Sequence, residues 1–443
     1  MKRLHHRLAG GALCALLVLP ATSLGGAVES SYRMARETIE SALAERGGAA
    51  WLARPVPVLF EAQGTLYQGA ELQGRAPGEP TPAAYHETWA YEPSSGRVAR
   101  EYRQKRPDGT HEWVREIYPG EGEQLLWLRD SGTVLRFTGP AMTASRDRNL
   151  RRFPHLLLEE TLNRPGAIRS MGKFGPFEAV QVQTRNNESL SLLFSHGTDT
   201  LSVVEYLDYL PGLGDSTVSW KFGDYRPVAG VGDVPHQYGV LVNQQRFADM
   251  KVGRVSTDAA EVAAFLTLPA ELGAPRDIEL PADWDPSARA SVEPLAEGVW
   301  AVRNLRPGFN TLFVEFASWV LAVDAPTGYP LLMELPAGDV IPAPHDGWLS
   351  QRYRDLIESE VGDKPVKAVA LTHFHNDHAG GLFAFAEQGV HLLVHESEVD
   401  AVRGLLDREH TLCPLEPHDR AGFKLEAVAD RRVLSDGRQR VEL

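Results

Sequence analysis

Three histidines and one aspartate lie within six residues near the carboxyl end of the chain, in the run Thr372-His373-Phe374-His375-Asn376-Asp377-His378-Ala379-Gly380-Gly381. The apolar run 366–371 that precedes them is typical of a buried strand, and Leu382 to Ala386 after the two glycines is typical of the start of a helix. The polar residues are therefore predicted on a strand-to-helix loop. In an α/β layer, such loops at the carboxyl ends of strands are where chemistry is carried out.

Neutral imidazole nitrogens beside a carboxylate are the donors that zinc, iron and manganese accept, and the loop contains no thiolate that would narrow the choice. His373 and His375 are placed to bind one ion together, whereas Asp377 and His378 diverge from that pair and are placed for a second ion. The alternative is a solvated loop that happens to be rich in histidine. An isolated His-x-His would favour that alternative, but the full pattern after an apolar strand favours metal binding.

The run resembles the metal-binding signature of the metallo-β-lactamase superfamily, a group of hydrolases with an αββα sandwich, and the resemblance extends over about residues 291–443. It implies a pair of Zn²⁺ ions, with Fe or Mn as alternatives, held by His373, His375, Asp377 and His378. It also implies a metal-activated hydroxide, oriented by Asp377 as the catalytic residue, that attacks a small-molecule substrate. An ester, a thioester, a lactam or a related compound would fit, and the sequence does not choose among them.

Elements typical of that fold flank the motif. Alternating or apolar runs predict strands at 297–302, 310–316, 319–324 and 391–395, and amphipathic patterns predict helices at 348–360 and 396–406. The resemblance implies that Asp324, at the end of the third strand, supports the metal loop from behind. A turn residue at a strand end is the equally weighted alternative for Asp324. We expect the remaining histidines of this region to be surface or core residues: His391, His395, His410 and His418.

The resemblance implies three further metal ligands beyond a hairpin centred on Asp436-Gly437, which is a strong turn signal. We therefore expect the chain to carry only the first half of the sandwich, as a fragment, the product of an interrupted gene or a degenerate relative. The inner face of the sheet would then lack its cover, so Phe313, Val320 and Leu321 are expected to be partly exposed. The competing functional hypothesis is a non-catalytic periplasmic binding or structural protein with a vestigial metal domain.

The amino end has the pattern of a secretory signal peptide over residues 1–27. A basic start at 2–7 precedes an apolar stretch at 8–24, and small residues follow at 25–27. The alternative is an uncleaved membrane anchor, for which the apolar stretch is barely long enough. A periplasmic or secreted protein with no stable membrane span after cleavage is therefore expected. Cys413 would then be the one cysteine left, so no intrachain disulfide is expected.

The 443 residues are enough for two or three domains, and the formal net charge of −14 argues against a nucleic-acid partner because phosphate backbones attract the opposite sign. Short alternating runs separated by Gly, Pro, Asp and Ser predict an antiparallel β-rich domain at 28–268, interrupted by one helix at 149–162. A linker at 269–290 would join it to the metallo-β-lactamase-like domain at 291–443. The expected fold class is thus α+β.

The phrases at 222–228 and 234–236 weakly resemble the closing strands of periplasmic lipoprotein-carrier domains, whose curved sheet holds apolar ligands. Two roles remain open for the β-rich domain. It is a structural or substrate-presenting module, or, by analogy of fold alone, a carrier of an apolar ligand. No constellation of nucleophile and base stands out within it.

Overall fold

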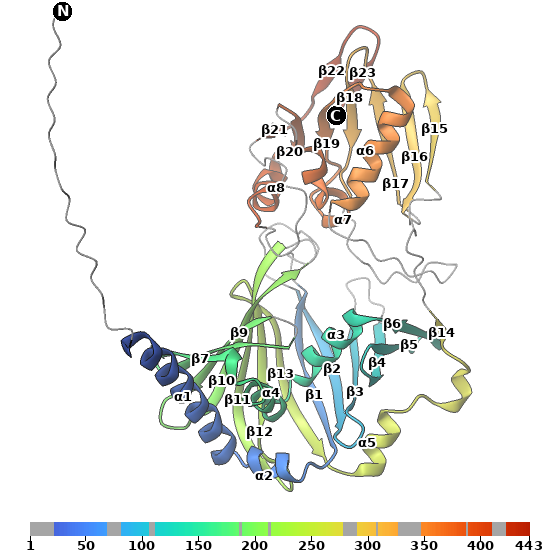
Figure 1. The fold of residues 1–443 in the computed structure, drawn as a ribbon. Coiled ribbons are helices and arrows are strands. Elements are labelled where there is room, and N and C mark those ends of the chain that lie inside the picture. Colours follow the sequence, from blue (N-terminus) through green and yellow to red (C-terminus); the bar gives the residue numbers. More distant parts are fainter. Residues whose placement is uncertain are drawn as a thin grey trace, which may run out of the picture.

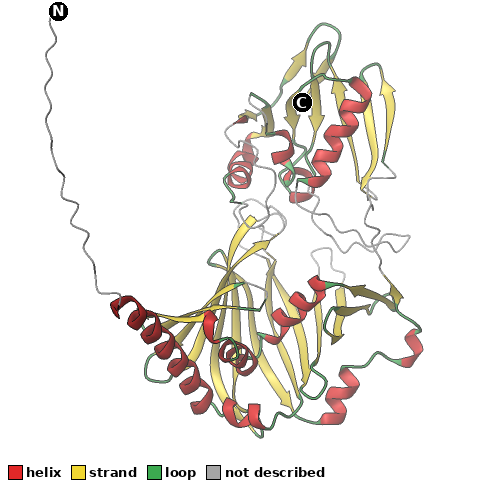
Figure 2. Cartoon of the chain, viewed as in Figure 1, coloured by secondary structure: helices red, strands yellow, loops and turns green. Residues whose placement is uncertain are grey.

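The computed structural model describes residues 22–68, 81–105, 111–185, 188–210, 214–277, 290–306, 309–326, 347–386, 389–409 and 422–443. The described residues form an α+β protein with two main sheets, as the sequence predicts (Figures 1 and 2). The first sheet belongs to the β-rich part of the chain and the second to the part that contains the metal loop.

The first sheet has fourteen strands. They are β1 (Val58–Gln68), β2 (Thr81–Glu92), β3 (Arg97–Lys105), β4 (His111–Gly120), β5 (Glu123–Leu128), β6 (Thr133–Thr138), β7 (Ile168–Phe174), β8 (Phe177–Gln183), β9 (Ser189–Ser195), β10 (Thr200–Leu210), β11 (Gly214–Val228), β12 (Gly232–Val242), β13 (Gln245–Ser256) and β14 (Arg276–Asp277).

The order of these strands is β14-β6-β5-β4-β3-β2-β1-β13-β12-β11-β10-β9-β8-β7. Two antiparallel meanders, β1 to β6 and β7 to β13, meet where β1 pairs with β13. The short strand β14 adds to the edge in parallel with β6. Part of the segment expected to be a linker therefore belongs to the first sheet.

Alternation along the strands gives this sheet two different faces. Leu59, Ala90, Ala99 and Ile117 are cross-strand neighbours on one face, where they pack against helix α5 (Ala259–Phe265). The residues immediately before or after them in each strand face the opposite side. These residues are Val58, Trp89, Val98 and Tyr118, and their buried side chains pack against Trp51 of α2 and against Phe153.

The other helices of this part are α1 (Thr22–Glu45), α2 (Gly48–Ala53), α3 (Pro140–Leu150) and α4 (Pro154–Leu162), with 3₁₀ turns η1 (Pro165–Ala167) and η2 (Ala270–Leu272). The single helix expected at 149–162 is wrong, because α3 ends at Leu150 and α4 starts anew at Pro154. Proline disfavours the helical conformation in the preceding residue, and Phe153 accordingly has extended dihedral angles of φ −101° and ψ 107°. The break places Arg151 and Arg152 in the connection between the two helices.

The second sheet has seven strands in sequential order. They are β15 (Ser291–Ala296), β16 (Val299–Arg306), β17 (Phe309–Glu315), β18 (Val320–Val323), β19 (Val366–Ala370), β20 (His391–His395) and β21 (Lys424–Val428). Pairing is antiparallel from β15 to β18 and parallel from β18 to β21. Its helices and turns are α6 (Trp348–Val361), α7 (Asn376–Ala379), η3 (Leu382–Phe385), η4 (Glu396–Glu398) and α8 (Val399–Leu406).

Both faces of the second sheet are covered, which contradicts the expected exposure of Phe313, Val320 and Leu321. All three side chains are fully buried. Phe313 and Val320 face the cluster that contains α6, η3 and α8. Leu321 lies on the opposite face, where the hairpin of β22 (Val433–Ser435) and β23 (Arg440–Glu442) supplies Leu434 and Val441 as cover.

Several sequence predictions concern residues outside the described ranges. Most of the expected signal peptide, residues 1–21, lies outside them, and so do His410, Cys413, His418 and the segment 278–289 of the expected linker. Helix α1 begins at Thr22, before the expected cleavage point, and packs against the edge strand β7. Within the ranges that the structure describes, no helix combines the length and apolarity needed to cross a membrane.

Helix α4 also carries a buried histidine that makes stability depend on pH. His155 is 2% exposed, and its ring lies against Phe153 with centroids 4.8 Å apart. Burial lowers the pKa of His155 from 6.5 to about 4. The unfolded chain therefore binds the proton first as pH falls. The contribution of neutral His155 to the stability of the fold is complete above about pH 6.5 and is lost as pH falls toward 4.

We expect the protein to lose about 2 kcal/mol of unfolding free energy from this histidine between pH 7 and pH 5. Urea denaturation of the native chain and of His155→Leu at both pH values measures the effect, and the variant should lack this part of the pH dependence. His196→Leu is the control, because His196 is exposed. An equal pH dependence in the native chain and in His155→Leu would contradict the assignment.

Candidate metal centre

The metal loop is held to the neighbouring strand by its own backbone. It leaves β19 after Ala370, and the amides of His378 and Ala379 donate to the carbonyl of His375 at 2.9 and 2.7 Å, which forms the short helix α7. The Ala325 amide, just beyond β18, donates to the His378 carbonyl at 2.6 Å. This bond ties the helix turn that carries the candidate ligands to the end of a central strand.

Three of the four predicted ligands come together in one cluster. His373, Asp377 and His378 offer donor atoms that all lie within 4.8 Å of one another. The rings of His373 and His378 have centroids 4.1 Å apart, and His378 Nε2 lies 3.6 Å from Asp377 Oδ2. The side chains of His378 and Asp377 are 24% and 40% exposed, so an ion could reach them from solvent.

The fourth predicted ligand, His375, lies beside the cluster. Its ring meets the ring of His373 edge-on, with centroids 4.5 Å apart, and it also contacts Phe374. The structure thus groups His373 with Asp377 and His378, whereas the sequence suggested that His373 would pair with His375. The two-ion assignment of the four residues remains a prediction.

Asp324 lies behind the loop, where the resemblance suggested a supporting carboxylate. It is 4% exposed and accepts hydrogen bonds from the amide and the hydroxyl of Thr372, at 2.8 and 2.9 Å to Oδ1. His378 Nδ1 lies 2.8 Å from Asp324 Oδ2. Because the carboxylate accepts, the proton sits on Nδ1, and Nε2 is the nitrogen that can bind a metal.

The backbone of Asp324 shows how firmly this arrangement is imposed. Its φ angle is +60°, in the left-handed region that residues other than glycine seldom adopt. Its amide donates to the Ala370 carbonyl at 2.9 Å, which joins the ends of β18 and β19. Strain of this kind persists where the surroundings fix the conformation, and here it aims the carboxylate at Thr372 and His378.

Gly381 closes the loop at a point with no room for a side chain. A Cβ atom there would lie 2.3 Å from Ser350 Oγ and 2.4 Å from the Pro326 carbonyl oxygen. Ser350 is fully buried and donates to that carbonyl at 2.8 Å, so neither atom can move aside without loss of a buried hydrogen bond. The second glycine of the motif therefore allows the loop to pack against α6.

We expect Gly381→Ala to lower the free energy of unfolding by about 1–3 kcal/mol, as overpacking does. Gly404→Ala is the matched control, because Gly404 lies in α8 with no atom within 4 Å of its added Cβ. Alanine should favour the helix there, by up to about 1 kcal/mol. Urea denaturation measures both, and equal effects of the two substitutions would contradict the packing argument.

Glu398 is a residue near the site that the sequence did not suggest. Its carboxylate accepts a hydrogen bond from the Phe374 amide and lies near His373 and His395. Burial raises the pKa of Glu398 above its usual value, and the two histidines oppose the rise. β19 and β20 are parallel neighbours, so the segments that follow them, the metal loop and the turn with Glu398, lie at the same edge of the sheet. The sequence could have indicated Glu398 through this strand pairing.

The donor set fits a divalent transition metal. Two imidazoles and one carboxylate match the three protein ligands that catalytic zinc sites use, and the buried Asp324 gives one imidazole the outer hydrogen bond typical of such ligands. His391 and His395 are not part of the cluster. His391 instead pairs with Glu426 at 3.2 Å, and His395 Nδ1 lies 2.6 Å from Ser397 Oγ.

Comparison with known families agrees with this geometry. Residues 342–411 match the model of the metallo-beta-lactamase superfamily, and this segment contains the whole metal loop. The match confirms the resemblance of this part of the chain to the metallo-β-lactamase superfamily. No curated protein matches the chain.

Solved structures similar to the chain include a putative outer membrane lipoprotein-sorting protein domain from Vibrio parahaemolyticus. It is 10% identical, with 52% of this chain and 94% of that chain covered and a TM-score of 0.32. The MucA/MucB complex of Pseudomonas aeruginosa is 12% identical, with 64% and 81% covered and a TM-score of 0.20. TM-scores of this size are below the range that establishes a common fold.

Proposed function

We propose that the chain is a metal-dependent hydrolase whose ion is held by His373, Asp377 and His378, with His375 beside them. The observation that carries the proposal is the clustering of these donors on a loop supported by the buried Asp324. The match of residues 342–411 to the metallo-beta-lactamase superfamily supports it. Zn²⁺ is the ion that the nitrogen and oxygen donors favour, with Fe or Mn as alternatives.

The residues of the chain have separable tasks in this proposal. Asp324 fixes the tautomer of His378 and, through Thr372, the start of the loop. Asp377 stands 3.6 Å from His378 Nε2 and is the carboxylate that can orient a nucleophilic water. The chemistry gained from a divalent ion at this place is the activation of water for attack on a carbonyl or phosphoryl centre.

The proposal includes a substrate class and a location. An ester, thioester, lactam or related small molecule is the substrate we infer, because these are the centres that such activated water attacks. The basic and apolar start of the chain supports a periplasmic or secreted location.

The test is to purify the full chain, measure bound metal by mass spectrometry and assay a panel of esters, thioesters, lactams and phosphodiesters. We expect bound zinc and a hydrolytic activity that a chelator removes and Zn²⁺ restores. A folded chain that binds no metal would overturn the proposal.

The alternative is a non-catalytic binding or structural protein whose β-rich part carries the function. Two cavities in this part, both lined by Arg152, Trp220 and Phe222, favour it as the second candidate. A chain that binds metal stoichiometrically but hydrolyses nothing in the panel would support this alternative over the hydrolase.

A further inference from the structure

The first sheet and the connection between α3 and α4 enclose a cavity of about 240 Å³. Its lining combines charged side chains with apolar and aromatic side chains of β9 to β11. The charged side chains are those of four arginines, Arg100, Arg148, Arg151 and Arg152, and of one carboxylate, Glu116. Arg148, Arg151 and Arg152 lie within five consecutive residues, at the break between α3 and α4.

The arginines outnumber the carboxylates that hydrogen-bond to them. Glu87 accepts from Arg100 at 2.8 Å and from Arg152 at 2.6 Å. Glu188 in the same way serves two arginines, Arg148 at 2.9 Å and Arg151. Three further carboxylates face the group at 3.6 to 3.9 Å, beyond hydrogen-bond distance: Glu116, Glu160 and Asp208.

Arg151 is the least satisfied of the four. Its side chain is 10% exposed, and its Nε and Nη2 atoms have no hydrogen-bond partner among the residues that the structure describes. A guanidinium has five donors, and buried donors without an acceptor cost free energy. An oxyanion in the cavity would supply acceptors to this cluster.

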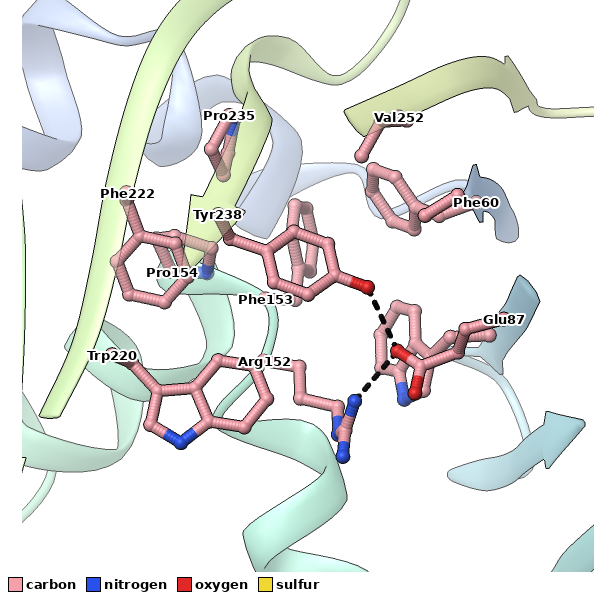
Figure 3. Close-up of a pocket in the computed structure, with 12 residues that line it drawn as sticks. Phe60, Glu87, Arg152, Phe153, Pro154, Trp220, Phe222, Pro235, Tyr238 and Val252 are labelled. Atoms are coloured by element: carbon pink, nitrogen blue, oxygen red, sulfur yellow. Dashed lines mark hydrogen bonds and ion pairs between the residues drawn. The ribbon is translucent and has the colours of Figure 1, made fainter. Parts of the chain in front are cut away.

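The aromatic part of the lining offers an apolar surface. Trp220 and Phe222 stack with ring centroids 6.5 Å apart, and the Arg152 guanidinium lies 4.8 Å from the Trp220 ring centroid. Both aromatic residues, together with Arg152, also line a smaller neighbouring cavity of about 40 Å³, which Figure 3 shows with Glu87 bound to Arg152 and Tyr238. A ligand can therefore contact charge and aromatic surface at the same time.

We propose that this cavity binds a small anionic amphiphile, with a phosphonate, phosphate or carboxylate group at Arg148 and Arg151 and an apolar ring against Trp220. The volume is below the range of about 300–1,000 Å³ that drug-sized ligands occupy, so the apolar body is about one ring. This site lies in the β-rich part and is independent of the proposed hydrolase activity.

Calorimetric titration of the full chain with phenylphosphonate tests the proposal, because its carbon–phosphorus bond resists hydrolysis. We expect saturable binding of phenylphosphonate. Phenol, which lacks the anionic group, and inorganic phosphate, which lacks the ring, should each bind more weakly. Arg148→Gln should weaken binding by roughly 10-fold or more, the value of a charge-assisted hydrogen bond. Arg148 is half exposed, so the variant should fold.

Two controls separate this site from other sources of binding. Arg226→Gln removes an exposed arginine paired with Asp224 outside the cavity and should leave binding unchanged. His378→Ala should also leave it unchanged, which distinguishes the cavity from the metal centre. Absence of binding, equal binding of phenol, equal binding of inorganic phosphate, or equal losses in Arg148→Gln and Arg226→Gln would each overturn the proposal.

Discussion

Replacing His378 with alanine is expected to reduce the zinc affinity of the chain by roughly 100-fold or more. His378 is one of three clustered donors, and its Nε2 is the atom left to bind an ion once Nδ1 is held by Asp324. Loss of an outer partner of a metal ligand alone costs about 10–100-fold in affinity, so loss of the ligand should cost at least as much. Competition with a chromophoric chelator measures the affinity.

Two further variants serve as references for the zinc affinity of His378→Ala: Asp324→Asn, with an intermediate loss expected, and His391→Ala, with none. Asp324→Asn keeps the shape but exchanges the acceptor that fixes the tautomer of His378, so a loss of about 10–100-fold is expected. His391 lies on β20 and pairs with Glu426, away from the cluster, so His391→Ala should retain the native affinity. If His378→Ala and His391→Ala bound zinc equally well, His378 would not be a ligand.

The candidate ligands could be predicted from sequence because they are local. Four chemically suitable residues lie on one loop, and the strand and glycines around them fix where that loop starts and ends. Glu398 and the contact between Gly381 and Ser350 were not predictable, since they depend on β20 and α6 reaching the loop in space. Which histidine joins Asp377 and His378 also depends on how the loop turns.

The fold shows the same division. Alternating apolar residues predict that the region 28–268 is rich in antiparallel strands, whereas β3 has little of that pattern. Its sequence from Arg97 to Lys105 is mostly charged, and partners on other strands compensate those charges, for example Glu87 on β2 and Glu116 on β4 for Arg100. The cover that β22 and β23 provide for the second sheet was likewise not predictable, because it depends on long-range packing of a short hairpin.

The second large effect is expected at Glu87, for which we expect alanine to lower the free energy of unfolding by about 3–5 kcal/mol. Burial alone would raise the pKa of Glu87, but Arg152 and Arg100 outweigh it and lower that pKa to about 2. The carboxylate is therefore charged at neutral pH, and its removal deprives two buried guanidinium groups of the acceptor to which both hydrogen-bond. Urea denaturation at pH 7 measures the loss.

Glu61→Ala is the matched control, because Glu61 pairs with Arg254 at 2.9 Å on the surface, with a side chain that is 48% exposed. Exposed pairs contribute about 0–1 kcal/mol, so this variant should have nearly the same free energy of unfolding as the native chain.

The lowered pKa of Glu87 also means that the stabilisation by its carboxylate is complete above about pH 4.5 and is lost as pH falls through about 2. The triple variant Glu87→Leu, Arg100→Met and Arg152→Met should recover stability relative to Glu87→Ala, because apolar replacement of a whole buried ion group is often neutral. If the triple variant were less stable than Glu87→Ala, the loss would come from packing rather than from unpaired buried charge.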